Sequence, residues 1–420
     1  MARSLYICYF GLREPLVQTQ VLPYLRELKK DGHELTLLTF EPEFSKRWSS
    51  EQVREERLKL ENEGIGWTAL AYHRRPSAVA TAYDIFRGAL AVRGLIRSEN
   101  LDILHARVHV PALMGALARS FTRRKPKMIF DIRGFFPEEY TDAGIWPENG
   151  LLYRSVKRIE KWLMKEADGF VILTEKAKTI LFPESADKSP VEGCGDKFNR
   201  PVEVIPCCVD FRRFDSVNVD TRNLMRKRLG VDGRRVVTYV GSFGGWYMTN
   251  ETADLLGAAR EKDSSVFALV LSQSPPEVME RLLRERGFSD RDLLITRVPA
   301  GEIPAYLSAA DAAVSLIKPC YSKQSSSPTK NAEYLACGLP IVANPGIGDV
   351  DELIIRTGTG ILLDGFDHES YVSALEKLEM LGDVNEICRK TAYDEFDLGR
   401  VGGERYRRLY RKLMDGREVK

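Results

Sequence analysis

The sequence has 420 residues, of which 44% are hydrophobic and 29% charged, and its formal net charge is +2. This composition is typical of a chain that buries large cores, and the length predicts two or three domains. Because the net charge is close to zero, the chain as a whole lacks the basic balance of a nucleic-acid-binding protein. We therefore expect no nucleic acid among its partners.

The cysteines and the N-terminal segment indicate where the protein works. The seven cysteines are scattered, and no two of them form a Cys-x-x-Cys pair. This pattern disfavours a disulfide framework or a zinc site and indicates a reducing compartment. The N-terminus holds too short an apolar run for a signal peptide, and no run approaches the roughly 20 apolar residues of a spanning helix. We therefore expect a cytoplasmic protein, at most peripheral at the inner face of a membrane.

The first half of the chain alternates strands with helices. A run rich in β-forming residues at 4–10 predicts a strand that Gly11 ends, and 17–31 has apolar residues at helical spacing. Within that helix, Pro23 indicates a kink or a late start. A strand at 34–40 completes a β–α–β unit, which predicts a parallel sheet. The pattern continues with strands at 102–106, 127–134, 169–174 and 203–206 and a long helix at 151–168.

A second series of alternating elements follows a boundary between about 206 and 220. Strands are predicted at 235–241, 267–272, 293–299 and 311–318, and helices at 249–262, 275–287, 302–310 and 368–381. Two open α/β domains in tandem are therefore expected. Ligands of such sheets bind beyond the carboxyl ends of the strands, so the default site is a cleft between two sheets that face each other.

The stretch SSSPTKNAEYLACGLPIV predicts a short helix whose N-terminal end, called here the helix mouth, carries polar residues. Ser327 is the predicted N-cap, Pro328 the first helical residue, and Gly338 ends the helix after about ten residues. The free N–H groups and the positive end of the helix dipole favour a phosphate or diphosphate, and Lys330 reinforces that preference. Glu333, on the same face, is suited to a ribose diol. The local features also fit a capped surface helix with a Lys330–Glu333 ion pair.

Three stretches in order carry a family resemblance. The helix-mouth stretch at 325–343 resembles the signature of the retaining glycosyltransferases of family 4. The segment 14–41 resembles their N-terminal loop and first helix. The segment 130–175, followed by VIPCCVD at 204–210, is similar to a bacterial subgroup of that family. The resemblance covers the chain from about residue 5 to about residue 410.

The resemblance implies the GT-B fold, in which two Rossmann-like domains with parallel sheets face each other across a cleft. It implies an N-terminal acceptor domain at 1–206 and a C-terminal donor domain at 207–392, with helices at about 393–420 packing back on the first. The implied activity is retaining transfer from a nucleoside diphosphate sugar, without metal or cofactor, to a glycan or lipid-linked acceptor in cell-surface polysaccharide synthesis. A nucleotide-sugar epimerase or a non-catalytic nucleotide-sugar-binding subunit remain the alternatives.

The resemblance also assigns donor residues, with two departures. The family has two glutamates separated by seven residues; the second matches Glu333, but the first falls on Ser325. The Arg and Lys that usually hold the diphosphate are missing after the strand at 235–241, so we expect backbone N–H groups and a lysine, with Lys323 one candidate, to replace them. The implied donor site comprises Gly11, Gly241, Ser242, Gly244, Lys318, Ser325, Ser326, Ser327, Pro328, Thr329, Lys330 and Glu333.

The implied catalytic residues lie at strand ends of the first domain. Asp131 stands where many relatives carry a histidine near the reacting sugar, and Arg133 follows two residues later. Asp131 can interact with the donor sugar or with an oxocarbenium ion, or it can form a salt bridge to Arg133 or Arg107. His109 is a third candidate, as is His105, although a strand-end histidine can also be structural.

Acceptor contacts are expected from two loops, and membrane contact from two basic segments. Glu14, Gln18, Glu139 and Trp146 are the predicted acceptor-binding residues, because carboxylates accept hydrogen bonds from sugar hydroxyls and tryptophan can stack on a sugar. The segment 119–127 has five basic residues in nine, and the helix at 151–166 carries five more beside apolar residues. These features fit contact with anionic lipid, or simply a solvated basic face.

Overall fold

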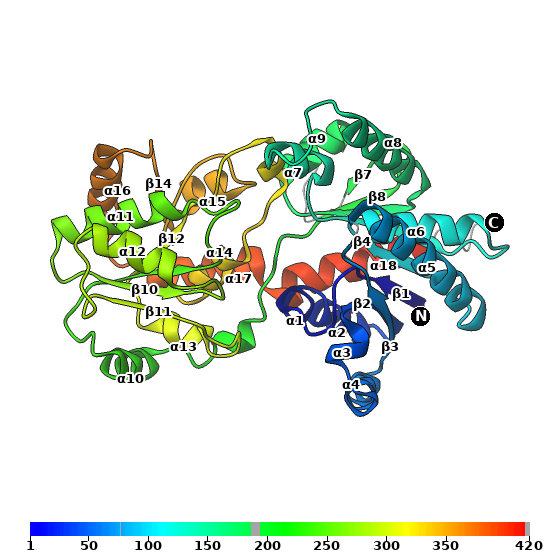
Figure 1. The fold of residues 1–420 in the computed structure, drawn as a ribbon, viewed down its shortest axis with the longest axis horizontal. Coiled ribbons are helices and arrows are strands. Elements are labelled where there is room, and N and C mark those ends of the chain that lie inside the picture. The colour runs from blue at the N-terminus through cyan, green and yellow to red at the C-terminus, as the bar shows by residue number, and fades with distance from the viewer. Residues whose placement is uncertain (76, 186–193, 416–420) are drawn as a thin grey trace. The chain divides into compact units, whose positions relative to one another are not determined.

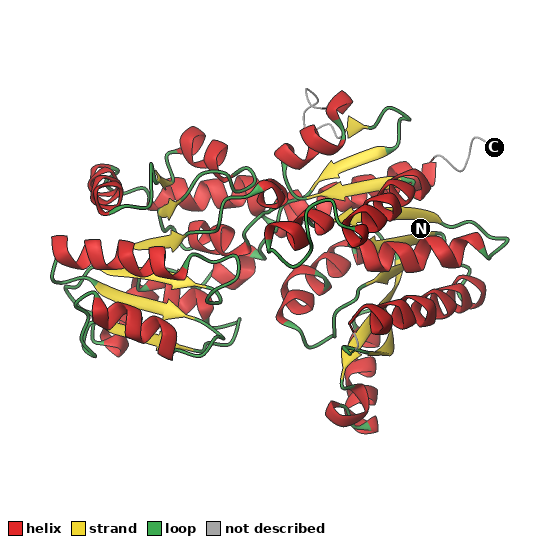
Figure 2. Cartoon of the chain, turned by 45° about the horizontal axis from the view of Figure 1, so that its top comes forward, coloured by secondary structure: helices red, strands yellow, loops and turns green. Residues whose placement is uncertain are grey.

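The computed structural model describes residues 1–75, 77–185 and 194–415. The chain divides into two compact units, each considered by itself (Figure 1). Unit 1 comprises Met1–Pro206 and Leu398–Lys420, and unit 2 comprises Cys207–Asp397. Each unit is built on a parallel sheet with helices on both faces, which confirms the predicted fold class of two α/β domains (Figure 2).

Unit 1 contains an eight-stranded sheet in the order β3-β2-β1-β4-β5-β6-β8-β7. All its pairings are parallel except that of β7 with β8. The strands are β1 Arg3–Ile7, β2 Glu34–Pro42, β3 Ile65–Tyr72, β4 Ile103–Arg107, β5 Lys127–Ile132, β6 Gly169–Ile172, β7 Cys194–Gly195 and β8 Pro201–Val204. The order reverses direction between β1 and β4, so the carboxyl ends of these two strands flank a topological switch point.

Helices of unit 1 connect the parallel strands and cover both faces of the sheet (Figure 1). They are α1 Pro15–Gln20, α2 Leu22–Lys29, α3 Phe44–Arg47, α4 Ser50–Asn62, α5 Ser77–Ser98, α6 His109–Ser120, α7 Phe136–Asp142, α8 Leu151–Glu166, α9 Glu175–Leu181 and α18 Glu404–Asp415, with a π-helix at Leu398–Gly403 and a 3₁₀ turn at Pro183–Ser185. The chain returns to unit 1 at Leu398, and α18 packs beside β8 and α2.

The predicted helix at 17–31 is broken into two. Val21 interrupts it with φ −125° and ψ −64°, and α2 begins at Leu22. Pro23 explains the break, because its ring disfavours helical geometry in the preceding residues and it has no N–H to donate. The kink expected from the sequence is therefore confirmed, two residues before the proline.

Unit 2 contains a six-stranded, fully parallel sheet in the order β11-β10-β9-β12-β13-β14. The strands are β9 Val236–Val240, β10 Phe267–Leu271, β11 Leu293–Thr296, β12 Ala312–Ser315, β13 Ile341–Ala343 and β14 Gly360–Leu362. Side chains alternate between two cores: Leu269 lies in one, and its neighbours Ala268 and Val270 lie in the other. Both faces are thus buried, as expected when crossover helices cover a parallel sheet.

Helices of unit 2 lie on both faces of its sheet and place the loops that follow the strands (Figure 2). They are α10 Val219–Leu229, α11 Thr249–Lys262, α12 Glu277–Glu285, α13 Ile303–Ser308, α14 Thr329–Ala336, α15 Val350–Thr357, α16 His368–Met380 and α17 Asn385–Phe396, with 3₁₀ turns at Phe211–Phe214 and Tyr321–Ser325. Among the described residues, no helix is long and apolar enough to cross a membrane.

Candidate functional site

In unit 2 the strand order reverses between β9 and β12, and the loops after these strands hold the predicted donor residues. The loop after β9 contains Gly241, Ser242 and Gly244, and the loop after β12 leads through Lys318 to the mouth of α14. Because all strands are parallel, both loops lie at the same edge of the sheet. Residues about 80 positions apart in the sequence are therefore neighbours at this edge.

The mouth of α14 differs from the predicted cap. Pro328 is the N-cap, with φ −69° and an extended ψ of 113°, and the helix begins at Thr329 and has eight residues. The prediction that Ser327 caps the helix is wrong. Its hydroxyl oxygen instead accepts a hydrogen bond from the Cys207 backbone N–H at 3.0 Å. The stop at Gly338 is confirmed, because this glycine takes a left-handed φ of 79° directly after the C-cap.

Lys330 is a buried lysine that has no hydrogen-bonding partner in the part of the chain that the structure describes. Its side chain is 8% exposed, and among the described residues no acceptor lies within hydrogen-bonding distance of Nζ. Nζ lies 4.6 Å from the ring centre of Tyr239 at the end of β9 and 5.0 Å from that of Tyr247 in the following loop. Burial lowers the pKa of Lys330 to about 7. An ammonium in this position lacks an anion.

Glu333 is not the partner of Lys330, so the surface ion pair considered from the sequence does not form. Its Oε1 accepts a hydrogen bond from Arg213 Nη1 at 3.3 Å, and Arg213 Nη2 donates to the Ala300 carbonyl at 2.6 Å. Burial raises the pKa of Glu333, and the charge of Arg213 opposes that rise. Arg213 therefore stabilises the ionised carboxylate, the form that accepts hydrogen bonds from hydroxyl groups.

The glycine-containing loop after β9 has the backbone that the sequence indicates. Gly241, Gly244 and Gly245 all take positive φ, at 151°, 73° and 60°. At Gly241 a Cβ would come within 2.9 Å of the Tyr239 hydroxyl, so this close approach needs glycine. At Gly244 and Gly245 a Cβ would meet nothing within 4 Å. There the positive φ alone favours glycine, and the open space leaves the backbone accessible.

The other predicted donor residues around the mouth differ in exposure. Ser325 is buried, and its hydroxyl donates to the Ser322 carbonyl at 2.7 Å. Lys323 is also buried, with Nζ 4.0 Å from the centre of the Trp246 ring. Lys318 is exposed. Of the three candidate lysines, Lys330 combines deep burial with the absence of a hydrogen-bond acceptor among the described residues, whereas Lys318 is solvated.

In unit 1 Asp131 lies at the centre of a buried polar network. It has no exposed surface, and Arg133 Nε lies 2.8 Å from its Oδ1. The Tyr406 hydroxyl of α18 donates to Oδ2 at 3.1 Å, and Arg107 lies 3.9 Å away. Burial alone would raise the pKa of Asp131, but Arg133, the His105 imidazole 3.4 Å from Oδ2, and Arg107 together hold it well below its usual value. The salt bridge considered from the sequence is therefore present, and a direct contact of Asp131 with the donor stays a prediction.

His109 opens α6 at the end of β4, beside the switch point of unit 1. Its Nε2 lies 2.8 Å from Glu160 Oε2 of α8, while Nδ1 is buried and without a hydrogen bond among the described residues. Lys157 contacts Glu160 as well. Burial would raise the pKa of Glu160, but His109 and Lys157 lower it below its usual value. The ionised Glu160 thus holds the imidazole with one nitrogen unpaired.

The predicted acceptor residues are distributed around the same edge of unit 1. Glu139 lies in the first turn of α7, where the positive end of the helix dipole stabilises acidic side chains. Trp146 stacks on Tyr140 with ring centres 4.4 Å apart, and a series of ring contacts continues through Phe136 to His109. Trp146 and His109, predicted separately, therefore belong to one aromatic cluster.

The loop after β1 carries the remaining predicted residues. Gly11 is buried, and a Cβ there would come within 2.9 Å of Glu41 and Pro42, so close packing already requires glycine at this position. Glu14 is the N-cap of α1, without a side-chain cap bond, and Gln18 donates to the Leu12 carbonyl at 2.7 Å. The donor role of Gly11 and the acceptor roles of Glu14 and Gln18 stay predictions.

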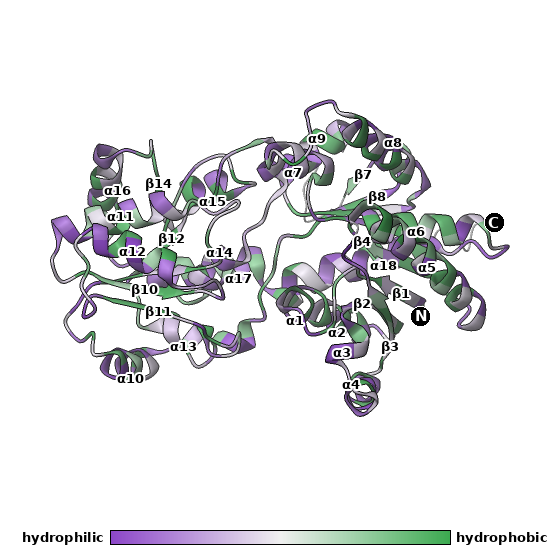
Figure 3. Cartoon of the chain, in the orientation of Figure 1, coloured by the Kyte–Doolittle hydropathy of each residue, from purple (hydrophilic) through white to green (hydrophobic). Residues whose placement is uncertain are grey.

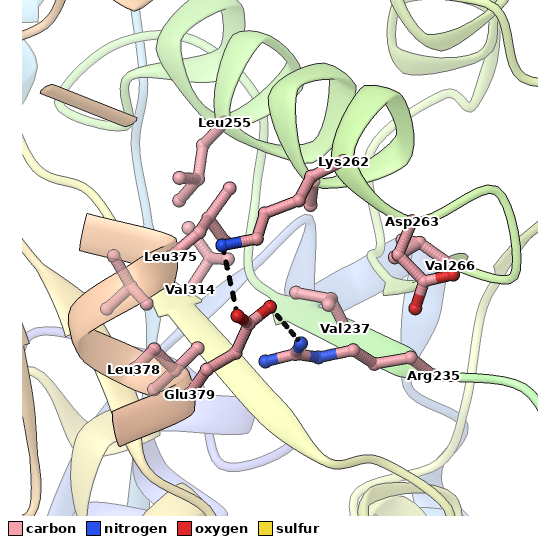
Figure 4. Close-up of a pocket in the computed structure, with 12 residues that line it drawn as sticks. Arg235, Val237, Leu255, Lys262, Asp263, Val266, Val314, Leu375, Leu378 and Glu379 are labelled. Carbon is pink, nitrogen blue, oxygen red and sulfur yellow. Dashed lines mark hydrogen bonds and ion pairs between the residues drawn. The ribbon is translucent and has the colours of Figure 1, made fainter. Parts of the chain in front are cut away.

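A pocket at the opposite edge of unit 2 is a poor candidate for the site. Figure 4 shows it around Glu379, which forms ion pairs with Arg235 and Lys262 at 2.8 and 3.0 Å beside apolar residues such as Leu375. Its free volume is about 10 Å³, near the minimum for a single water molecule. The described residues contain no group of three or more His, Cys, Asp or Glu side chains arranged to hold a metal ion.

Several functional candidates were not apparent in the sequence. Arg213 lies 120 positions from Glu333, and Tyr239 and Tyr247 have no motif that marks them as neighbours of Lys330. Glu160 has one sequence signal, an acidic residue among the basic positions of α8. Such pairings depend on which strands adjoin in the sheet.

Comparisons with known proteins agree with this architecture. Residues 17–191 match the family model described as glycosyl transferase 4-like domain, and residues 220–395 match glycosyl transferases group 1. Together the two matches cover most of the chain and correspond to unit 1 and unit 2. The chain therefore belongs to the group 1 (family 4) glycosyltransferases with the GT-B fold.

The individual proteins that are similar to this chain have low sequence identity to it. The 2-deoxystreptamine glucosyltransferase of Streptomyces kanamyceticus is 27% identical over 214 residues, which are 49% of this chain and 50% of that protein. The chain thus matches about half the length of this curated relative. Sucrose-phosphate synthase of Thermosynechococcus elongatus has a TM-score of 0.70 at 15% identity, covering 99% of this chain and 100% of that chain. Anabaena HepE, solved with UDP-glucose, has a TM-score of 0.66 at 15% identity, covering 98% and 100%. At these identities the two structures show the fold alone.

Proposed function

We propose that this protein transfers a sugar from a nucleoside diphosphate sugar to a hydroxyl acceptor, with retention of configuration. The observation that carries the proposal is Lys330, a buried lysine without a hydrogen-bond acceptor among the described residues, at the mouth of α14 and beside the glycine-containing loop after β9. A diphosphate supplies the missing anion, and the backbone N–H groups of the helix mouth and the loop add donors. Family membership and the UDP-glucose bound to HepE support a sugar nucleotide as the ligand.

The donor's nucleoside end is assigned to Glu333. Its carboxylate accepts hydrogen bonds from the ribose diol, and Arg213 fixes that carboxylate in orientation and charge. Among the described residues Oε2 of Glu333 has no hydrogen bond of its own, which leaves it for a ribose hydroxyl. Ser326 and Thr329, at the same end of α14, are assigned to the sugar and phosphate end of the donor. Ser325 is assigned there through its backbone, because its hydroxyl is bonded to the Ser322 carbonyl.

In the reaction, the bond between the anomeric carbon and the diphosphate oxygen breaks as the acceptor oxygen bonds to that carbon on the same face. The acceptor proton passes to the leaving diphosphate. Lys330 and the helix mouth stabilise the charge that develops on this leaving group. No step of this scheme requires a metal ion. We assign Arg133 and His109 to the reacting sugar, and Asp131 to holding Arg133 in place as well as to its predicted role at the sugar.

The acceptor is proposed to be a glycan or lipid-linked glycan of cell-surface polysaccharide synthesis. Glu14, Gln18, Glu139 and Trp146 are the residues assigned to it, and Trp146 belongs to an aromatic cluster whose faces suit sugar rings. A peripheral position at the inner face of the membrane would bring such an acceptor within reach. The basic side chains of α8, among them Arg154, Arg158 and Lys161, support that position because they favour anionic lipid.

Product detection with a panel of nucleoside diphosphate sugars and bacterial glycan acceptors tests the proposal. We expect a glycosylated acceptor whose new linkage has the anomeric configuration of the donor, as read by NMR. An isomerised sugar nucleotide formed without acceptor would instead identify an epimerase. Donor binding without any turnover would identify a non-catalytic subunit, and either result would overturn the proposed transfer.

A further inference from the structure

The outward face of α5 carries an apolar stripe that no other part of the described chain covers. Val79, Tyr83, Phe86 and Leu90 are 67%, 46%, 61% and 46% exposed. Their spacing of four, three and four residues places them on one side of the helix, within about 60° of each other. Figure 3 shows α5 largely in the colour of hydrophobic residues. Four large apolar side chains in line on a surface helix form a continuous patch rather than scattered exposure.

This stripe is separate from the face that anchors α5 to unit 1. The buried face consists of Ala80, Asp84, Gly88, Val92 and Ile96, which follow one another at steps of four residues. The angular positions of the two series differ by roughly 160°. The helix is therefore attached to the sheet by one side, and the folding of unit 1 does not require the apolar residues on the other.

The charges beside the stripe are of one sign. Arg87 and Arg97 are exposed on α5, as are Arg74 and Arg75 just before the helix. Between residues 73 and 98 the single acidic residue is Asp84. Its carboxylate is buried and accepts hydrogen bonds from the Tyr9 hydroxyl and the His73 backbone N–H. The exposed surface of α5 thus combines large apolar side chains with arginines and presents no carboxylate.

We propose that α5 is an interfacial helix that binds unit 1 to an anionic lipid surface, with Val79, Tyr83, Phe86 and Leu90 inserted between headgroups and the flanking arginines paired with lipid phosphates. Apolar insertion and arginine attraction act together on such a surface. Tyr83 and Phe86 suit the boundary between headgroups and acyl chains, where aromatic rings are favoured. This role does not involve the donor site of unit 2 and does not depend on the proposed reaction.

The charge pattern argues against a second copy of the chain as the occupant. If two α5 helices paired through their stripes, the arginines of one copy would lie near those of the other. No exposed carboxylate of α5 would compensate them. Like charges at a contact destabilise it. An anionic bilayer supplies negative charge to the arginines on every side of the stripe.

Vesicle co-sedimentation of the full chain tests the proposal. We compare vesicles containing phosphatidylglycerol with vesicles of pure phosphatidylcholine, for the wild-type chain and for the double variant Phe86→Ser/Leu90→Ser. We expect binding to the anionic vesicles that weakens with salt, and a loss of about tenfold or more in the partition coefficient for the double variant. A second double variant, Arg87→Gln/Arg97→Gln, is expected to lose binding to the anionic vesicles.

The matched control is Ile355→Ser/Met380→Ser, which removes two comparably exposed apolar residues from unit 2, 75% and 85% exposed. It should bind vesicles as the wild type does. Thermal melting and nucleotide binding of every variant should be unchanged, because the substituted residues lie outside both the core and the donor site. Three results would overturn the proposal: absence of wild-type binding, equal binding by Phe86→Ser/Leu90→Ser, or a wild-type dimer in size-exclusion chromatography that this double variant abolishes.

Discussion

Six adjacent strands follow the same order in the two units, but the electrostatics at the carboxyl edge of the two sheets differ. In unit 1 the charges at the end of β5 are paired with one another: Asp131 is fully buried between Arg133, His105 and Tyr406. In unit 2 the buried Lys330 has two tyrosine rings nearby but no acceptor among the described residues. At one edge the buried carboxylate has its counter-charges in the free protein, whereas at the other the buried lysine has none among the described residues.

This difference indicates a division of labour. A paired, buried network rigidifies its surroundings and holds the groups at its border in fixed positions. An unpaired cation keeps the free protein less stable than it would be without that charge, and binding of an anion relieves the cost. Unit 1 therefore provides a preformed frame, whereas unit 2 gains interactions when the donor binds.

The largest effect is expected from breaking the paired network. Asp131→Asn leaves Arg133 and Arg107 without their shared carboxylate, and should lower the free energy of unfolding of unit 1 by about 3–5 kcal/mol. A denaturant titration measures this loss. The control is Glu34→Gln, which removes an exposed ion pair with Arg3 and should cost less than about 1 kcal/mol. Similar small losses in both variants would show that Asp131 is not the centre of the network.

At Lys330 we expect substitution to weaken ligand binding without lowering the stability of the fold. Lys330→Met should weaken nucleoside diphosphate binding roughly 30-fold or more, the value of a charge-assisted hydrogen bond of about 2–3 kcal/mol. The same variant should melt at the same temperature as the wild type or higher, because the buried charge is gone. Calorimetric titration and thermal melting give both quantities. Lys318→Met, at an exposed lysine, is the control, and an equal loss of affinity there would place the diphosphate at Lys318.

The coupling between Arg213 and Glu333 gives a smaller effect. Glu333→Ala and Arg213→Ala should each weaken nucleoside diphosphate binding about tenfold, because both act on the same ribose contact. The double variant should then lose little more than either single one. Additive losses would show that Arg213 acts independently of Glu333. If neither change affects affinity, the ribose lies elsewhere.

The smallest effect is expected at Ser325, the position of the missing family glutamate. Its hydroxyl is buried and bonded to the Ser322 carbonyl. Ser325→Ala should therefore change the donor KM by less than about threefold, a difference under 1 kcal/mol. Initial-rate kinetics of the variant and the wild type measures this change. A loss of tenfold or more would show that Ser325 turns toward the sugar when donor binds.

Elements with one clear apolar period could be predicted from the sequence, whereas α5, which has two, could not. Most strands of both sheets and the short helix between Pro328 and Gly338 follow from apolar runs and from the conformational limits of proline and glycine. By contrast, β3 and α5 are absent from the predicted elements. On α5 an outward apolar stripe adds to the buried one, so the helical period is obscured.

For the site, local chemistry could be predicted but pairing could not. The polar mouth of α14 and the importance of Lys330 and Glu333 are visible in one short stretch. Which cation pairs with Glu333 depends on a contact across 120 residues, and the lack of a partner for Lys330 is a property of the folded chain. The predicted serine cap was wrong because the Ser327 hydroxyl bonds to Cys207, far from it in the sequence.

Proton uptake on nucleoside diphosphate binding tests the central claim most directly. The pKa of Lys330 is lowered to about 7 by burial, so at pH 8.5 this lysine is mostly neutral in the free protein and must gain a proton to pair with the diphosphate. The diphosphate itself is fully ionised at that pH. Calorimetry in buffers of different ionisation enthalpy should show uptake of about one proton per diphosphate bound by the wild type, and none by Lys330→Met. Binding without proton uptake by the wild type would contradict the account, because the buried lysine would then not be the group that receives the diphosphate.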